Sequence, residues 1–168
     1  GELDFDNQTG LPWTIQDNFN LTGSGGFGGF NYNGPGVIRN VSGTNKITGS
    51  IVIENPGVHA LIVSAGGSLE LAGPIANSLP GDRSVVLGGT APGIVSGSIN
   101  DYLNTGGQII SRTGIEKVGT GTWTFDGSVG GGAYSNGVAT VYDGTLKLVN
   151  NAAFSAPAAI ALASSTAT

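Results

Sequence analysis

The sequence predicts an all-β fold, a single-stranded parallel β-helix (β-solenoid) with about 20–30 residues per coil. Three observations support this: an excess of glycine, a low content of charge, and a short motif that recurs at a coil-like interval. Glycine accounts for 31 of the 168 residues, more than twice its usual share of about 7%. Because glycine inside a helix costs about 1 kcal/mol relative to alanine, strands and turns are expected nearly throughout.

The low charge indicates a folded chain with an uncharged polar surface. Charged residues make up 10% of the chain and hydrophobic residues 39%, whereas disordered chains combine low hydrophobicity with high net charge. The net charge is −5 and the six Lys and Arg residues are scattered. This argues against nucleic-acid binding, because no basic patch is available to neutralise phosphates. The longest uncharged stretch, residues 148–168, is broken by Asn and Pro and makes a poor membrane span.

The recurring motif is a five-residue pattern, apolar–x–Gly–Ser/Pro–apolar. It occupies residues 47–51, 71–75, 95–99 and 125–129, with a degenerate copy from Leu21. The motif glycines, from Gly23 to Gly127, follow one another at intervals of 26, 24, 24 and 30 positions. An interval of roughly 20–30 residues without helices is what one coil of a β-solenoid requires.

A second pattern, Gly–Ser/Thr–apolar–x–apolar, predicts the strands themselves. It occurs at residues 49–53, 67–71, 121–125 and 144–148, and its period-2 alternation is that of a short half-buried strand. In the last three copies the middle residue is expected to point outward (Glu70, Thr124, Lys147) and its neighbours inward (Leu69, Leu71, Trp123, Phe125, Leu146, Leu148). An antiparallel β-sandwich also has short strands, with turn signals every 8–12 residues, and is kept as the alternative fold.

The chain divides into three regions on this interpretation. Residues 1–35 form an N-terminal cap or atypical coil, in which Trp13, Phe19 and the aromatic segment 27–32 cap the end or pack as a satellite cluster. Residues 36–154 form the solenoid coils. Residues 155–168, with a strand-like stretch at 159–162, continue the solenoid or pair with a neighbour.

Residues 114–125 (GIEKVGTGTWTF) and 139–152 (ATVYDGTLKLVNNA) together resemble the autotransporter-associated β-strand repeat. The residues that match its two halves are Lys117, Gly119, Gly121, Thr122, Trp123 and Phe125, then Gly144, Thr145, Leu146 and Leu148. Residues 36–53 are similar to segments that precede such repeats. The resemblance implies a right-handed parallel β-helix in the exported part of a large bacterial surface protein, with a structural rather than catalytic role. The chain departs from the pattern in the loop 126–138 and in having one full copy.

No catalytic, cofactor or metal site is predicted. Glycoside hydrolysis uses two carboxylates about 5–10 Å apart, and Asp126 and Asp143 would approach each other if their coils stacked. Both precede a glycine, which is typical of turn residues. Glu2, Asp4 and Asp6 share one strand face, an arrangement that suits a solvated edge opposing end-to-end pairing better than a cation site.

Other polar residues give weak signals. His59 is the only histidine and follows Pro56 and Gly57, so we expect a polar loop residue rather than part of a triad or zinc site. The glycine-rich segment 23–30 lacks the Lys and Ser/Thr of a phosphate loop. Asn-x-Ser/Thr triplets begin at Asn7, Asn20 and Asn40, and three tyrosines that the sequence allows to contact sugars are Tyr102, Tyr134 and Tyr142.

The function expected from these features is that of a non-enzymatic, extracellular structural segment of an exported bacterial protein. The chain lacks cysteine and begins at Gly1 rather than Met, which we interpret as a processed form or an excised fragment. Self-association by end-to-end coil stacking, up to a filament, or continuation in a longer chain is expected. Two alternatives stay open: a carbohydrate- or host-binding adhesin module, and a polysaccharide-active β-helix enzyme.

Overall fold

The computed structural model describes residues 1–23, 32–54, 59–126, 138–149 and 159–163. These residues form strands and turns, with no helix among them. The strands are β1 (Leu3–Asp6), β2 (Trp13–Ile15), β3 (Phe19–Leu21), β4 (Ile38–Ser42), β5 (Thr44–Ile47), β6 (Ile51–Ile53), β7 (His59–Ser64), β8 (Ser68–Leu71), β9 (Ile75–Asn77), β10 (Arg83–Gly88), β11 (Gly93–Val95), β12 (Ile99–Asn100), β13 (Tyr102–Leu103), β14 (Ile109–Ser111), β15 (Thr113–Lys117), β16 (Thr122–Phe125), β17 (Val138–Val141), β18 (Thr145–Leu148) and β19 (Ala159–Leu162).

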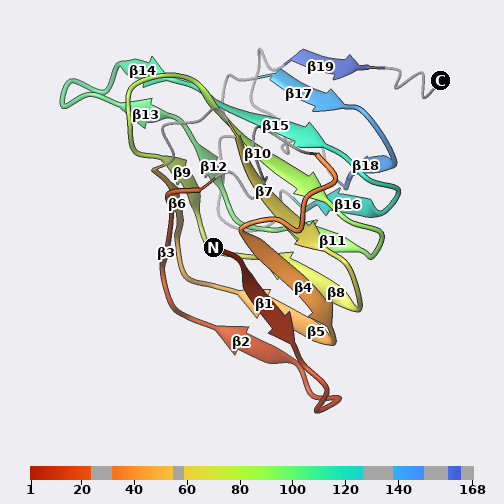
Figure 1. Cartoon of the computed structure of the whole chain (residues 1–168). Helices are drawn as coiled ribbons and strands as arrows, with labels where there is room; N and C mark the ends of the chain where they lie inside the picture. The colour runs from red at the N-terminus through yellow and green to blue at the C-terminus, as the bar shows by residue number, and fades with distance from the viewer. Residues whose placement is uncertain (24–31, 55–58, 127–137, 150–158, 164–168) are drawn as a thin grey trace.

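Three parallel sheets contain all of these strands except β13 and β14. Sheet 1 has the order β1-β4-β7-β10-β15-β17-β19, sheet 2 the order β2-β5-β8-β11-β16-β18, and sheet 3 the order β3-β6-β9-β12. The chain therefore visits the sheets in turn, and each visit adds one strand beside the previous one (Figure 1). We call one such visit, with one strand in each sheet, a layer. The first layer is β1, β2 and β3.

Successive layers are held in a regular register. Ile47 pairs with Leu71 in sheet 2, and Leu71 pairs with Val95, so the partners follow one another at the same interval as the motif glycines. Val95 then pairs with Phe125, which lies further along the chain because the antiparallel pair β13–β14 is inserted before β15. The inserted hairpin explains the longer interval between the last two motif glycines.

Parallel pairing decides between the two predicted folds. Among the described strands, only β13 and β14 pair antiparallel, so the alternative of an antiparallel β-sandwich is wrong. The all-β, parallel arrangement is confirmed and is consistent with a β-solenoid.

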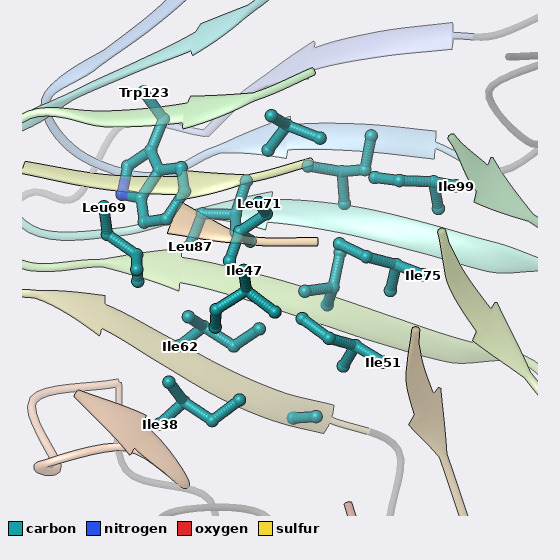
Figure 2. Packing of buried hydrophobic residues seen from close by; sticks show 14 of the residues in the cluster. Ile38, Ile47, Ile51, Ile62, Leu69, Leu71, Ile75, Leu87, Ile99 and Trp123 are labelled. Atoms are coloured by element: carbon teal, nitrogen blue, oxygen red, sulfur yellow. The ribbon is translucent and has the colours of Figure 1, made fainter. Parts of the chain in front are cut away.

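The inner faces of the sheets form one apolar core that runs through the layers (Figure 2). The members of this core with no exposed surface include Ile47, Ile53, Ile62, Leu69, Leu71, Ile75, Leu87, Val95, Ile99, Trp123 and Phe125. The inward orientation predicted for the copies at 67–71 and 121–125 is confirmed. In the copy at 144–148, Leu148 is 40% exposed, because β18 is the last strand of sheet 2 among the described residues.

The motif glycines stack directly upon one another at the corner between sheets 2 and 3. A Cβ atom added to Gly73 would overlap the carbonyl oxygen of Gly49, and one added to Gly97 would overlap that of Gly73. The backbones of adjacent layers therefore approach too closely for any side chain. This contact is the physical reason for the recurring glycine.

A second corner, between sheets 1 and 2, requires glycine for its backbone conformation. Gly67 has a φ of 67° and Gly144 a φ of 70°, in the left-handed region that other residues rarely adopt. Each glycine also lies against the backbone of the layer before it, Gly67 against Gly43 and Gly144 against Gly119. The strand pattern Gly–Ser/Thr–apolar–x–apolar thus begins at this corner in the copies at 67–71 and 144–148.

A large and a small residue share one level of the core. Gly93 is the partner of Trp123 in adjacent strands, and a Cβ atom on Gly93 would overlap the indole ring. The indole Nε1 donates a hydrogen bond of 3.0 Å to the carbonyl oxygen of Gly88. The glycine therefore leaves the space that the tryptophan fills.

We predict that Gly73→Ala lowers the free energy of unfolding by about 3 kcal/mol, since overpacking costs of this order follow when side chains meet fixed backbone. The matched control is Gly23→Ala, whose Cβ would meet only the Val37 side chain, at 3.7 Å, and should change stability by less than about 0.5 kcal/mol. Urea unfolding followed by circular dichroism measures both. Equal effects of the two substitutions would contradict the stacked-glycine explanation.

Candidate functional site

Buried asparagines satisfy backbone groups at the corner between sheets 1 and 2. Asn40 Nδ2 donates to the carbonyl oxygens of Gly66 and Ser68, at 2.5 and 3.2 Å. Asn45 Nδ2 donates to Asn40 Oδ1 and Asn7 Nδ2 donates to Asn45 Oδ1, so the three side chains form one network. Asn7 and Asn40 are 3% and 0% exposed, so these two triplet asparagines serve the core rather than the surface.

Lys117, the lysine of the repeat-like motif, performs the same task in a later layer. It has no exposed surface, and its Nζ donates to the carbonyl oxygens of Val118, Gly119 and Asp143, at 2.6, 2.6 and 3.2 Å. Burial lowers the pKa of Lys117 to about 8, while the charge of Asp143 acts in the opposite direction. The ammonium group thus joins two successive turns, and its donors are occupied by the backbone.

A cluster of four polar side chains lies on the outer face of sheet 1. Glu116 is 7% exposed and accepts a hydrogen bond of 2.7 Å from the Tyr32 hydroxyl. His59 Nδ1 lies 3.0 Å from the other Glu116 oxygen, and the rings of Tyr32 and Tyr142 are 5.2 Å apart. Burial, and then the hydrogen bond to Glu116, raises the pKa of Tyr32 above its ordinary value. Apolar side chains from the same face pack beside the cluster: Leu61, Val63, Val86 and Val118.

The prediction that His59 is a loop residue is wrong. It is the first residue of β7 and pairs with Ser84 of β10. Nothing in the local sequence connects His59 with Glu116, because they are brought together only by the register of β7, β10 and β15. The role of Tyr32 is also only partly as expected, since it belongs to a satellite cluster on sheet 1 rather than to an N-terminal cap.

A groove of about 600 Å³ lies beside this outer-face cluster. Its lining comes from the segment 32–35 and from four successive layers, represented by Arg39, Ala65, Thr90 and Gly119. Four layers span about 14 Å at the usual strand spacing. Arg39 Nη1 lies 3.6 Å from Glu2 Oε1. The groove therefore has a flat floor of small residues and a polar wall with one cation and one aromatic ring.

The structure does not bring Asp126 and Asp143 together. Asp126 directly follows β16 and Asp143 precedes β18, and these strands pair from Thr122 with Thr145 to Phe125 with Leu148. The two aspartates thus lie at opposite ends of a four-residue strand pair, which spans about 13 Å. Asp143 Oδ1 accepts a hydrogen bond of 2.8 Å from the Gly144 amide, as expected for a turn residue.

The N-terminal carboxylates are engaged with their neighbouring strand. Asp6 Oδ1 accepts a hydrogen bond of 2.6 Å from Ser42, and Glu2 faces Arg39. Within the part of the chain that the structure describes, no group of three or more His, Cys, Asp and Glu side chains is arranged to hold a metal ion. These acids therefore help to align β1 with β4.

On the outer face of sheet 2, charged residues form a ladder across layers. Lys46 Nζ and Ser96 Oγ lie 2.9 and 2.6 Å from the same Glu70 oxygen. Burial favours the protonated form of Glu70, but the hydrogen bonds from Lys46 and Ser96 outweigh it and lower its pKa. Glu70 points outward, as predicted.

Comparisons with protein families, curated proteins and solved structures found no match. The resemblance to autotransporter-associated repeats therefore rests on the sequence motifs. Of the predicted sugar-contacting tyrosines, Tyr102 is half-buried in β13 and Tyr142 packs on Tyr32. Tyr134, the glycine-rich residues 24–30 and most of 155–168 lie outside the described residues. No helix in the described part of the chain has the length and hydrophobicity to cross a bilayer.

We predict that Lys117→Met removes a pH dependence of stability. The pKa of Lys117 is about 8 in the folded protein and about 10.4 in unfolded chains. Between these values the unfolded state binds more protons, so wild-type stability rises with pH, by about 2 kcal/mol between pH 8 and 10. Urea unfolding of both proteins across this range should give a difference that changes with pH. Parallel curves would contradict the lowered pKa.

Proposed function

We propose that this chain is a structural segment of an exported bacterial surface protein, folded as a right-handed parallel β-solenoid. The observation that carries the proposal is the uninterrupted pairing of sheets 1 and 2 through six layers, with sheet 1 adding a seventh strand. The core beneath them is continuous. Each layer adds one strand spacing of about 4.8 Å, so the architecture sets length without needing a separate core for each unit.

The use of buried polar groups supports a structural role. Asn40, Lys117 and the Trp123 indole all donate to backbone carbonyls at turns. The two aspartates considered from the sequence as a hydrolytic pair lie at opposite ends of their strands. The described residues thus favour a scaffold over a polysaccharide-active enzyme.

Extracellular location is proposed from composition and from the motif resemblance. A surface made polar by uncharged residues suits stacked β-structure, because Ser, Thr and Asn side chains pair along the ladder of layers. Asn18 Oδ1, for example, accepts from the Ser50 amide and hydroxyl of the next layer, at 2.8 and 2.9 Å. The match of Lys117 to Phe125 and of Gly144 to Leu148 with the autotransporter-associated repeat supports the same assignment.

A glycan-binding module is the second candidate, and the groove on sheet 1 favours it. Tyr32 offers an aromatic surface and Arg39, Asn33 and Thr90 offer polar groups along about 14 Å. This combination suits a short, linear saccharide that carries an acidic group, because a cation lies at the wall.

The scaffold proposal predicts that a whole layer is dispensable. Deleting residues 48–71 joins Ile47 to Ala72, and because Ile47 pairs with Leu71 the remaining strands keep their register. Deleting residues 48–59 removes half a layer and should prevent folding. Both deletions and the intact chain are placed between an export signal and an outer-membrane anchor, and intact cells are labelled with an antibody. We expect surface signal within about twofold of the intact chain for the first deletion and at least a tenfold loss for the second. Equal loss in both would contradict the proposal.

For the glycan candidate, we predict that uronic-acid oligosaccharides bind the purified chain more tightly than neutral ones. Arg39→Gln should weaken that binding at least tenfold, measured by isothermal titration calorimetry. Arg112→Gln is the control, because Arg112 is exposed and does not line the groove, and it should leave binding unchanged. No binding by any of the oligosaccharides would remove this candidate.

A further inference from the structure

The C-terminal end of the layered stack is stepped. Sheet 1 ends with β19, which pairs with β17, whereas sheet 2 ends one layer earlier with β18. Figure 1 shows β19 lying beyond β17 at this end of the molecule. One strand position beside β18 is therefore vacant in the described residues, next to a sheet that already extends past it.

The core positions of β18 are uncovered. Leu148 is 40% exposed, whereas Leu71, Val95 and Phe125, which precede it in the same column of sheet 2, have no exposed surface. Leu146 continues the column of Leu69, Gly93 and Trp123 and is half-buried. A further strand with apolar residues at two alternate positions would continue both columns.

The backbone of β18 also faces this position. The amides of Thr145 and Val149 donate back to Gly121 and Phe125, at 3.3 and 3.0 Å. Alternate residues of a parallel strand bond to opposite neighbours, so the N–H and C=O groups of Leu146 and Leu148 point to the free edge. The Leu69 amide, at the equivalent level, donates to Pro92 of the following layer at 3.3 Å, which shows how a following strand binds at this level.

We propose that the free edge of β18 binds an extended peptide segment, supplied in trans, that adds a parallel strand with the pattern Gly–Thr–apolar–x–apolar. The apolar residues cover Leu146 and Leu148, and the residue before the first of them accepts a hydrogen bond from the Leu146 amide. This inference rests on the parallel register and is independent of the scaffold function. It is the strand-addition mode of peptide recognition.

A strand fits this step better than a second whole copy does. The opposite end of the stack is level, because β1 and β2 both belong to the first layer. A copy placed on β19 would leave the position beside β18 empty. That opposite end also carries Glu2 and Asp4 beside β1 and Pro12 before β2, features that discourage strand addition at an edge.

The test is a titration of the isotope-labelled chain with the peptide Gly-Thr-Leu-Lys-Leu-Val, followed by amide chemical shifts. The control peptide, Gly-Leu-Thr-Leu-Lys-Val, has the same composition with the apolar positions displaced by one. We expect saturable shifts at Leu146 and Leu148 with the first peptide and binding at least tenfold weaker with the second. Leu148→Asp should weaken binding at least tenfold, and Lys147→Ser, on the outer face of the same strand, should change it less than twofold.

A third peptide, N-methylated at its lysine, keeps the test valid if Leu148→Asp fails to fold. That amide must donate to β18 in the proposed register, so methylation should abolish binding to the unaltered chain. Equal binding of the displaced or methylated peptide, or shifts centred on β2, would overturn the proposal. Sedimentation showing that the chain alone self-associates through β18 would also overturn it, in favour of a second copy.

Discussion

The structure depends on how closely the backbones of successive layers approach at the corners. At the corner between sheets 2 and 3, Gly73 lies against the carbonyl of Gly49 and Gly97 against that of Gly73. Strands in a sheet are about 4.8 Å apart, and a chain that turns a corner while keeping that spacing has no room for a Cβ atom. The glycine content of this sequence is therefore a steric requirement of stacking, and the interval between glycines records the length of a layer.

The same corners create the need for buried polar side chains. Where a strand ends, its carbonyl groups no longer meet a neighbouring strand, and a buried carbonyl without a donor costs about 1–3 kcal/mol. Asn40 and Lys117 supply donors between sheets 1 and 2. At another corner Arg83, 7% exposed, donates to the carbonyl oxygens of Leu79 and Pro80 at 3.0 and 3.1 Å. The polar interior thus serves the turns, which is why charged residues are buried in a chain that has few of them.

The outer faces are where layers create sites that no local sequence shows. Residues separated by one or two layers become neighbours, as in the contact between His59 and Glu116 or that between Lys46 and Glu70. The groove near Arg39 arises in the same way, from residues of four layers. Any binding property of this chain is accordingly expected on a sheet surface or at a free strand edge, and not in the filled interior.

The sequence by itself determined the all-β class, the length of a layer and the alternation that buries Leu69, Leu71, Trp123 and Phe125. These follow from local rules, since glycine turns and period-2 alternation are properties of a few adjacent residues. Only the tertiary structure decided that the strands pair in parallel, that His59 starts a strand and meets Glu116, and that Lys117 is fully buried. Those outcomes depend on the register between segments one or more layers apart in the chain, and register is set by the packing of the whole stack, which no short stretch of sequence encodes.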